Sequence, residues 1–478
     1  MAATTSASAP AATPAATPAT SRNLELAMLA FAATVVTTAL VLVELNQSND
    51  LTRALLYYGA AFLGLFAVAH VAVRILAPYA DPLILPCVAV LNGLGLVFIH
   101  RLDLAEAVAA AVSGDPIPAG DVPRQIAWTT LALGLFVAVL VLVRDHRMLA
   151  RYGYTAGLTG LVLLALPGLL PSSISEVNGA KIWLRFGGLG IQPGEFAKIL
   201  LMIFFASFLV TKRDLFNTAG KKVLGMELPR PRDLAPLLVA WGLSLGVLVL
   251  EKDLGSSLLF FGIVLVLIYI ATERIAWLVI GLSFFVAGAV LAHSLFEHVQ
   301  DRVTAWLDPF SDIDGAGYQM AQSLFGLGTG GVFGTGLGAG RPDEVPEAPT
   351  DFITAAIGEE LGFVGLAAVL FTYLLVVMRG MRTALAVRDT FGKLLAAGLS
   401  FAMGLQVFVV VGGVTKLIPL TGLTAPFLSY GGSSLLANYI LVALLLRISN
   451  SARAPLPSAP RKPAAPLAEA HTEMVKRP

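Results

Sequence analysis

Long apolar runs recur along almost the whole chain and are separated by shorter polar stretches. Runs of about 17 to 25 apolar residues match a helix that crosses a hydrocarbon core of about 30 Å. The pattern predicts an all-α polytopic membrane protein with about twelve spans, near residues 24–43, 54–76, 82–99, 126–143, 154–170, 195–211, 235–250, 256–271, 275–293, 353–378, 393–412 and 424–446.

The composition supports this fold class. Hydrophobic residues make up 56% of the 478 residues and charged residues only 13%, which excludes an ordinary soluble protein. The net charge is only +1, and the charged residues are divided among the loops rather than gathered on one basic face. The charge therefore indicates no nucleic-acid partner. Cys87 is the single cysteine, which excludes an internal disulfide and argues against a zinc cluster.

The basic residues predict the orientation. They gather in the loops 144–151, 212–232 and 379–393, which fall on one side of a twelve-span bundle. The excess of Lys and Arg in cytoplasmic loops assigns that side, and both termini, to the cytoplasm. The outer side then receives the loops 100–125, 171–194, 294–352 and 413–423.

Both ends of the chain differ from the apolar runs. Residues 1–21 are rich in Ala, Pro, Thr and Ser, and residues 448–478 are rich in Pro and Ala, so both are predicted to be disordered tails. The first tail lacks the basic start and apolar core of a signal peptide. With no soluble domain predicted, we expect the chemistry to fall to intramembrane polar residues and outer loops.

The outer loop 171–194 is followed by a charged pair. The loop places several polar and aromatic residues just before a helix predicted to begin at Pro193, namely Lys181, Trp183, Arg185 and Gln192. Glu195 and Lys198 then share one helix face at an i, i+3 spacing, which suits a polar cavity better than lipid. The alternative is a Glu favoured by the helix dipole and a Lys that extends to the interface.

Three charges, Glu251, Lys252 and Asp253, interrupt the apolar stretch 235–271. Such a group is too costly to bury in hydrocarbon, so it predicts a turn between two spans at the outer face. Asp253 is equally well explained as the N-cap of the following helix.

The glycine-rich segment FGLGTGGVFGTGLGAG at 325–340 resembles a nucleotide-binding loop only superficially. A dinucleotide fingerprint requires a preceding strand and a βαβ unit, whereas here the neighbours are membrane helices. We interpret the glycines as allowing tight turns and close approach of the backbone to a ligand.

Asp351 stands at the end of the loop 294–352, immediately before an apolar run. It has two interpretations that the spacing does not separate. It is either the N-cap of the next helix or a carboxylate at a water-accessible cavity that accepts a proton from a sugar hydroxyl.

Five segments, in order, resemble the SEDS family of RodA and FtsW peptidoglycan polymerases. They are IQPGEFAK, EKDLGSS, DPFSDIDGAGYQMAQSLFGLGTGG, PTDFITAAIGEELG and GLTAPFLSYGGSSLL, spread over roughly residues 175–447. The resemblance implies a catalytic core at 175–447 that contains the large outer loop 294–352, preceded by N-terminal helices at 22–174. Because the family has about ten spans, two N-terminal spans are extra, as in longer actinobacterial members.

The resemblance also implies an activity. The family joins lipid II units into glycan strands at the outer face of the bacterial cell membrane, releases undecaprenyl pyrophosphate with inversion, and works with a class B penicillin-binding protein. We favour a RodA-type role in elongation and cell shape over an FtsW-type role in division. The alternatives are a lipid II flippase or transporter, because intramembrane charges also mark transport pathways, and a scaffold that recruits a transpeptidase.

By this resemblance the essential acid of the family is Asp351. Its cavity-lining residues correspond to Trp183, Gln192, Glu195, Lys198 and Asp253, with Lys416 and the segment 429–432, which begins at Ser429, matching less closely. The chain departs from the family pattern at Ile182, Gly194 and Pro349, where Arg, Ser and His are usual.

The proposed chemistry needs cations as well as a base. We expect phosphate charge to be stabilised by basic residues of the outer loops and helix ends, namely Lys198, Arg185, Lys416 and Arg302. A divalent cation, Mg²⁺ or Mn²⁺, could share that task, although the sequence contains no dedicated metal cage.

Overall fold

The computed structural model describes residues 20–48, 51–177, 179–186, 189–212, 222–223, 226–227, 231–315 and 317–455. Apolar helices occupy all twelve predicted runs: α1 (Arg22–Ser48), α2 (Arg53–Leu76), α3 (Ile84–Ser113), α4 (Val122–Leu142), α6 (Gly153–Leu169), α8 (Pro193–Thr211), α10 (Pro231–Leu250), α11 (Leu254–Thr272), α12 (Ile275–Leu295), α15 (Ile353–Ala386), α16 (Thr390–Val414) and α17 (Gly432–Arg453). Within the described residues, ten are long and apolar enough to cross a membrane, and α6 and the apolar part of α10 are shorter.

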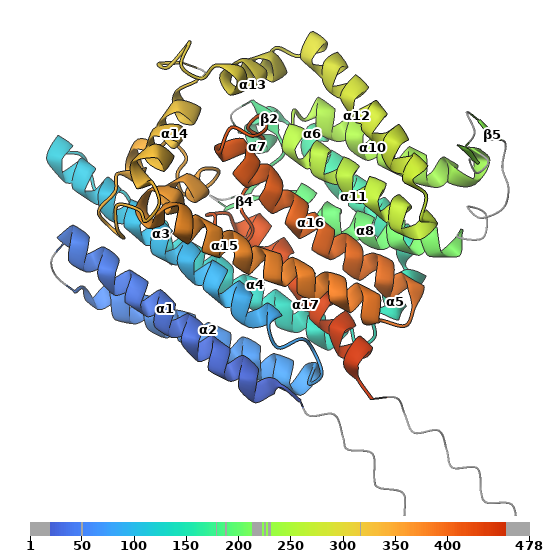
Figure 1. The fold of residues 1–478 in the computed structure, drawn as a ribbon, viewed down its shortest axis with the longest axis horizontal. Helices are drawn as coiled ribbons and strands as arrows, with labels where there is room; N and C mark the ends of the chain where they lie inside the picture. The colour runs from blue at the N-terminus through green and yellow to red at the C-terminus, as the bar shows by residue number, and fades with distance from the viewer. Residues whose placement is uncertain are drawn as a thin grey trace, which may run out of the picture.

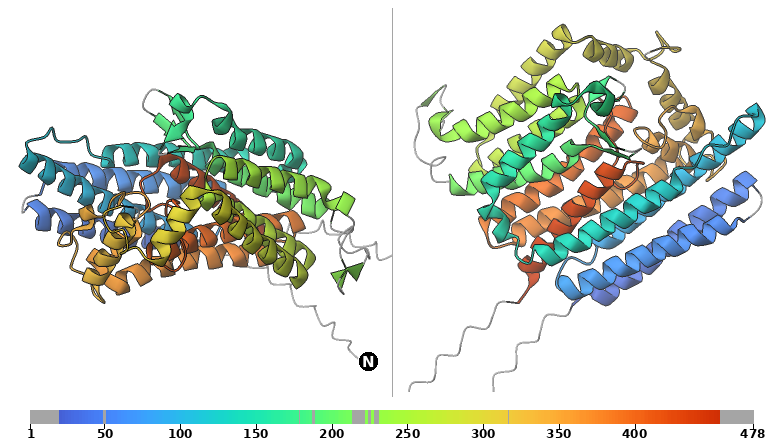
Figure 2. Two further views of the ribbon diagram at one scale, coloured as in Figure 1. Left: turned by 90° about the horizontal axis from the view of Figure 1, so that it is seen from above. Right: turned by 180° about the vertical axis from the view of Figure 1, so that it is seen from behind.

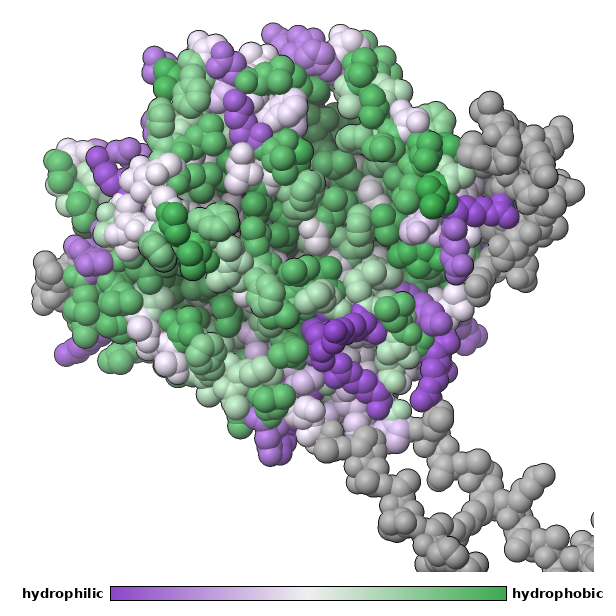
Figure 3. All heavy atoms as spheres, in the orientation of Figure 1, coloured by the Kyte–Doolittle hydropathy of each residue, from purple (hydrophilic) through white to green (hydrophobic). Residues whose placement is uncertain are grey.

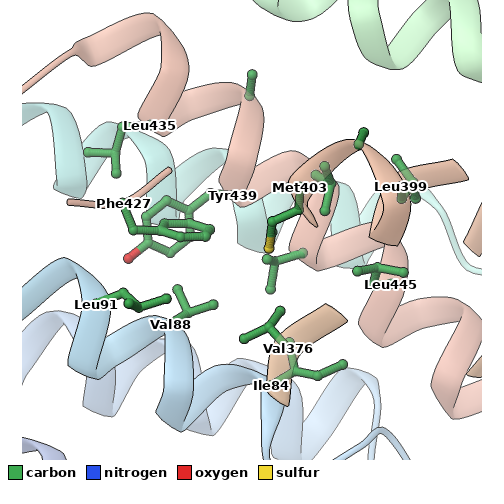
Figure 4. Packing of buried hydrophobic residues seen from close by; sticks show 14 of the residues in the cluster. Ile84, Val88, Leu91, Val376, Leu399, Met403, Phe427, Leu435, Tyr439 and Leu445 are labelled. Atoms are coloured by element: carbon green, nitrogen blue, oxygen red, sulfur yellow. The ribbon is translucent and has the colours of Figure 1, made fainter. Parts of the chain in front are cut away.

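Helix α17 lies at the centre of the bundle and α12 at its edge (Figure 1). Tyr439 of α17 is fully buried, and its ring lies 5.2 Å from that of Phe427 and 6.3 Å from that of Phe136. Figure 4 shows Tyr439 and Phe427 packed beside Val88 and Leu91 of α3. By contrast, the apolar side chains of α12 are exposed or half-buried, and Gly281 is its buried residue, as expected for a helix that faces lipid.

Helices α1 and α2 form a layer along one side of the bundle, packed on α3 and α4 (Figures 1 and 2). The contact is close because Gly93 of α3 has no side chain. A Cβ there would lie 2.2 Å from the side chain of Val36 in α1. Small residues of this kind allow membrane helices to approach one another without a hydrophobic driving force.

Charged side chains join the helix ends on the side predicted to be cytoplasmic. Asp81 accepts a hydrogen bond of 2.7 Å from Nε of Arg379 and a second from Arg453. His146 lies 2.9 Å from Asp389, which is the N-cap of α16. Figure 3 shows apolar residues over most of the face in view, with hydrophilic residues toward its upper and lower margins.

The outer loop 294–352 contains short helices that the sequence analysis did not predict. They are α13 (Glu297–Leu307), α14 (Tyr318–Gly330) and the 3-10 helix η1 (Pro342–Glu344). Their polar and glycine-rich sequences lack the long apolar run on which the prediction of spans depended.

The tight turns predicted for the glycines of 325–340 are confirmed by positive φ at Gly331, Gly334, Gly336 and Gly338, and glycines of the segment also approach α15. Their approach to a ligand stays a prediction. A Cβ on Gly330 would lie 2.2 Å from the carbonyl oxygen of Gly358, and one on Gly334 would lie 2.2 Å from that of Glu360. Helix α15 is interrupted at Gly362, where φ is +68°, and the glycine-rich backbone packs against this interruption. Only glycine combines that conformation with so close a contact.

A short helix, α5 (Arg147–Arg151), follows α4. The predicted outer loop 171–194 folds into several short elements. The loop comprises α7 (Ser172–Ser175) and two antiparallel hairpins, β1 (Glu176–Val177) with β2 (Ala180–Lys181) and β3 (Leu184–Phe186) with β4 (Leu189–Ile191). A third hairpin pairs β5 (Lys222–Val223) with β6 (Met226–Glu227).

Several predicted boundaries differ from the structure. Helix α3 continues to Ser113 rather than ending near residue 99, and α17 begins at Gly432 rather than 424. Residues 424–431 are non-helical, because Pro426 and Gly431 disfavour helix there. Helix α17 extends to Arg453, inside the predicted tail 448–478, whereas residues 1–19 and 456–478 of the two tails lie outside the described residues.

Candidate active site

A cavity of about 1100 Å³ opens at the end of the bundle where α8, α11, α15 and α17 begin. It is surrounded by α4, the two hairpins of residues 176–191, α13, α14 and the segments 347–351 and 420–434. Its polar and aromatic lining comprises Arg124, Trp128, Trp183, Gln192, Glu195, Asp253, Asp301, Arg302, Trp306, Gln319, Glu347, Thr350, Asp351, Thr424, Tyr430, Ser433 and Ser434.

Asp351 is held in this cavity by the backbone on either side of it. The N–H of Tyr430 donates to the carbonyl oxygen of Pro349 at 2.7 Å, and the hydroxyl of Ser429 donates to that of Thr350 at 2.5 Å. Phe352 follows Asp351 and is fully buried in a small apolar cluster. The carboxylate therefore projects from a segment whose neighbours are fixed.

Asp351 does not cap the following helix. Helix α15 begins at Ile353 after Phe352, whose side chain makes no capping hydrogen bond. Burial raises the pKa of Asp351 to about 6, the negative charge of Glu347 adds to the increase, and Arg302 opposes it. The carboxyl thus has an affinity for protons suited to a general base near neutral pH.

Arg302 of α13 faces the same point as Asp351, beside Gly422. A Cβ on Gly422 would lie 3.7 Å from Oδ2 of Asp351 and 3.8 Å from Nη2 of Arg302. Nη1 of Arg302 donates to the carbonyl oxygen of Leu420 at 3.3 Å. A fixed guanidinium beside the acid can stabilise negative charge that develops there.

Glu195 and Lys198 form a buried ion pair at the N-terminal end of α8. Nζ of Lys198 donates to Oε2 of Glu195 at 2.9 Å and to the side-chain oxygen of Gln406 at 3.0 Å. The two charged residues are only 7% and 4% exposed, which rules out a lysine that extends to the interface. Glu195 lines the cavity, and Lys198 lies behind it.

Asp253 fulfils both interpretations that its sequence context left open. It is the N-cap of α11, because its carboxylate accepts from the backbone N–H of Ser256 at 2.9 Å, and it also lines the cavity. Burial raises the pKa of Asp253, against the lowering effect of the Ser256 hydrogen bonds. Glu195 raises it further, and Arg302 lowers it.

Comparison with known proteins decides the family. The profile of the FtsW/RodA/SpoVE family, described as cell cycle proteins, matches residues 81–454. The chain belongs to the FtsW/RodA/SpoVE family. It is 58% identical to the peptidoglycan glycosyltransferase RodA of Mycobacterium tuberculosis over 458 residues, 96% of each protein. It is 33% identical to the probable peptidoglycan glycosyltransferase FtsW of Trichlorobacter lovleyi, over 78% of this chain and 94% of that protein.

A solved structure has the same fold. It comes from work on how a peptidoglycan synthase complex coordinates polymerization and crosslinking, and it matches with a TM-score of 0.59 and 27% identity over 77% of this chain and 97% of that one. The family match starts just before α3, so it includes ten of the twelve apolar helices and leaves out α1 and α2. It also begins well before residue 175, where the motif resemblance starts.

Six of the ten predicted site residues line the cavity of this FtsW/RodA/SpoVE protein. They are Trp183, Gln192, Glu195, Asp253, Arg302 and Asp351. The six come from α8, α13 and the segments that precede β3, α8, α11 and α15, so residues far apart in sequence meet at one site.

The other four predicted site residues do not line the cavity. Arg185 is exposed on β3, and Lys198 is occupied by Glu195 and Gln406. Lys416 presents its backbone carbonyl to Nε1 of Trp306 at 3.1 Å. Ser429 donates to the backbone before Asp351, so it positions the acid rather than contacting a ligand.

The sequence analysis missed Arg124 and Trp128. They lie at the start of α4, one helical turn apart, so they share a face. Arg124 is, with Arg302, one of two cations in the cavity lining of the described residues. Their i, i+4 spacing at the start of an apolar run is visible in the sequence, but neither residue lies in the five family motifs.

Within the described residues, no group of three or more His, Cys, Asp or Glu side chains is arranged to hold a metal ion. Five acids line the cavity, namely Glu195, Asp253, Asp301, Glu347 and Asp351. A divalent cation held by one or two carboxylates and by substrate phosphates, as Mg²⁺ commonly is, stays a prediction.

Gly432→Ala is expected to distort the cavity wall, because a Cβ there would lie 2.3 Å from the indole ring of Trp128. We expect it to destabilise the protein by about 1–3 kcal/mol, as overpacking does, and to shift the tryptophan emission. Denaturant titration followed by fluorescence measures both. Gly431→Ala is the matched control, since its Cβ would make only ordinary contacts, with Thr424 at 3.6 Å and Ser434 at 4.0 Å. Equal destabilisation by the two variants would contradict the prediction.

Proposed function

We propose that this chain is a RodA-type peptidoglycan glycosyltransferase that joins lipid II units into glycan strands. The observation that carries the proposal is the 58% identity to Mycobacterium tuberculosis RodA over 96% of both proteins. The lower identity and coverage of the FtsW relative favour a role in elongation over one in division. The cavity supports the same reaction, because it combines a carboxylate base, arginines and aromatic rings.

In the proposed transfer, Asp351 is the base. The hydroxyl oxygen of the acceptor sugar attacks the anomeric carbon of the growing chain, its proton passes to the Asp351 carboxylate, and a new glycosidic C–O bond forms. The bond between the anomeric carbon and the pyrophosphate breaks on the opposite face. Its electron pair leaves with undecaprenyl pyrophosphate, so the configuration inverts.

The cations of the lining have a separate part in this reaction. Arg302 lies beside Asp351, and Arg124 lies on α4. Guanidinium groups bind phosphate oxygens in bidentate fashion, so these two arginines are suited to hold the pyrophosphate groups of the two lipid-linked substrates. Trp128, Trp183 and Trp306 offer flat apolar faces for sugar rings.

We place the active site on the outer side of the membrane and both termini in the cytoplasm, as the basic loops indicate. Residue 314 is exposed in the same outer loop as Asp351, so it serves as the topology probe. An Asp314→Cys variant in a Cys87→Ser background should react with an impermeant maleimide added to intact cells. Labelling only after the cells are broken would overturn this orientation.

The similarity to a solved structure from a peptidoglycan synthase complex supports a partner that crosslinks the product. We propose a class B penicillin-binding protein in that role.

Incubation of the purified protein with lipid II tests the proposal against its rivals. We expect glycan polymer to form, and to form faster when the penicillin-binding protein is added. A flippase would move labelled lipid II across vesicles without making polymer, and a scaffold would do neither. Either of those results would overturn the glycosyltransferase proposal.

A further inference from the structure

Helices α1 and α2 lie outside the family match at 81–454, yet the end of α1 contacts the outer loop. The side-chain amide of Asn46 donates to the carbonyl oxygen of Leu337, and that of Gln47 donates to the carbonyl oxygen of Gly338. Both acceptors belong to the glycine-rich segment 325–340. The extra helix pair α1–α2 therefore contacts the glycine-rich segment through hydrogen bonds to the backbone carbonyl groups of the segment.

The opposite side of the glycine-rich segment is held by charged residues of the family core. The N–H of Gly338 donates to Glu360 of α15 at 2.9 Å. Arg101 of α3 donates to the same carboxylate at 2.8 Å and to the carbonyl oxygen of Gly340 at 2.7 Å. Arg101 and Glu360 are buried, so these bonds are shielded from water. Residues 338–340 are thus clamped between α1 on one side and α3 and α15 on the other.

The end of α1 is itself fixed. Glu44, one turn before Asn46 and Gln47, is fully buried and lies 3.3 Å from His100 of α3. Its carboxylate also accepts hydrogen bonds from the backbone N–H of Thr52 at 2.8 Å and from the hydroxyl of Thr52 at 2.5 Å. The two amides therefore project from an ordered helix end rather than from a free terminus.

The clamped segment leads directly to the base. After Arg341, whose N–H donates to Glu359 at 2.7 Å, the chain forms η1 and enters a small apolar cluster. Val345, Ala348 and Phe352 are buried in that cluster. Asp351 stands between the last two, so a shift of the glycine-rich segment is transmitted to its carboxylate.

We propose that Asn46 and Gln47 are positioning residues for glycosyl transfer, and that the α1–α2 pair supports the active site through the glycine-rich segment. The inference rests on the proposed function. Displacement of a catalytic group by about 1 Å lowers the rate by up to about a hundredfold, so loss of these two hydrogen bonds should be measurable in turnover.

The first test removes both donors. We expect Asn46→Ala/Gln47→Ala to lower kcat for lipid II polymerisation about tenfold and to leave KM within about twofold, because the cavity that binds substrate is distant from the change. Thr34→Ala is the control on the same helix, since that hydroxyl donates only to Ala30 of α1. An unchanged kcat, or a loss confined to the amount of folded protein, would overturn the proposal.

The second test restores the contact covalently. A Cβ on Gly338 would lie 2.9 Å from that of Asn46, which is near the separation of about 3.8 Å that a disulfide needs. Because φ at Gly338 is +78° and strains any side chain there, Gly338→Cys alone is measured as the control, and the effects below are taken relative to it. In Asn46→Cys/Gly338→Cys, the reduced form should be as slow as the alanine variant. Oxidation should restore kcat to within about twofold of that of Gly338→Cys, because the bond replaces the lost donor. If Asn46 and Gln47 only stabilised the fold, kcat per folded molecule would not change reversibly when one folded sample is reduced and oxidised.

Failure to pair, or oxidation without recovery, would overturn the inference. The parent protein in the same assay separates the two hypotheses. If the parent makes no polymer, the proposed function is wrong. If the parent is active and the variants match it, only the role of Asn46 and Gln47 is wrong. Cys87, the single native cysteine, is buried and is replaced by Ser as a precaution against mispairing.

Discussion

Asp351→Asn is expected to lower the rate of lipid II polymerisation about a thousandfold, the effect of removing a general base. Asparagine has the same size and leaves intact the bonds at Pro349 and Thr350 that hold the segment. It cannot accept the proton of the attacking hydroxyl. Rates measured on purified protein with labelled lipid II test this, and binding of substrate should persist.

The same carboxylate predicts a pH dependence. Burial raises the pKa of Asp351 to about 6, so the proton occupies it below that pH and the base is lost. The rate should fall about tenfold per pH unit below about pH 6 and reach a plateau above about pH 7. In Asp351→Asn this dependence should disappear from whatever activity remains.

Asp314→Asn is the control for this pair of predictions, because Asp314 is an exposed acid of the same loop. It should polymerise lipid II at the parent rate with an unchanged pH profile. If Asp351→Asn retained the parent rate, Asp351 would not be the base, and the proposed chemistry would need another carboxylate of the lining.

The second large effect is expected at the buried pair of α8. Lys198→Met should destabilise the protein by about 3 kcal/mol or more, because Glu195 is left with an uncompensated charge at a nearly buried position. Glu195→Gln should destabilise the protein by a similar amount, because the positive charge of Lys198 is then uncompensated at a buried position. The double variant should be more stable than the sum of the two losses implies, since neither charge then remains. Denaturation in mixed micelles measures all three.

The pair Arg341 and Glu344 is a matched control. It has the same i, i+3 spacing and an N–O distance of 2.9 Å, but its side chains are 74% and 47% exposed. Its coupling energy should be below about 1 kcal/mol, because water screens exposed ion pairs. If the two pairs had equal coupling energies, or if Glu195 and Lys198 had none, the prediction that burial strengthens the ion pair would be wrong.

Most of the fold could be predicted from sequence because a bilayer imposes a local rule. A run such as residues 256–271 must form a helix in hydrocarbon whatever its neighbours are, since its backbone groups have no other partners. The same rule failed for α13 and α14, which lie in a polar loop and are ordered by packing rather than by length and hydropathy. The starts of α3 and α8 agreed within about two residues, whereas α17 began later than predicted.

The candidate site was predictable in part, and for a related reason. Glu195 and Asp253 were recognised because charges in apolar runs are costly and therefore visible. Lys198 was included on the same argument, and Arg185 as a cation of the predicted outer loop, but neither lines the cavity. One is exposed on a hairpin and the other is committed to a partner on α16, which no spacing along the chain reveals.

The sequence by itself determined the number of apolar helices, the candidate acid and the family motifs, because each depends on residues that are close together in the chain. The tertiary structure alone decided that Asp351 faces Arg302 rather than capping α15, that the glycines of 325–340 contact α15, and that α1 contacts the glycine-rich segment. Those contacts join residues tens to hundreds of positions apart. They are set by how helices pack against one another, which local hydropathy does not specify.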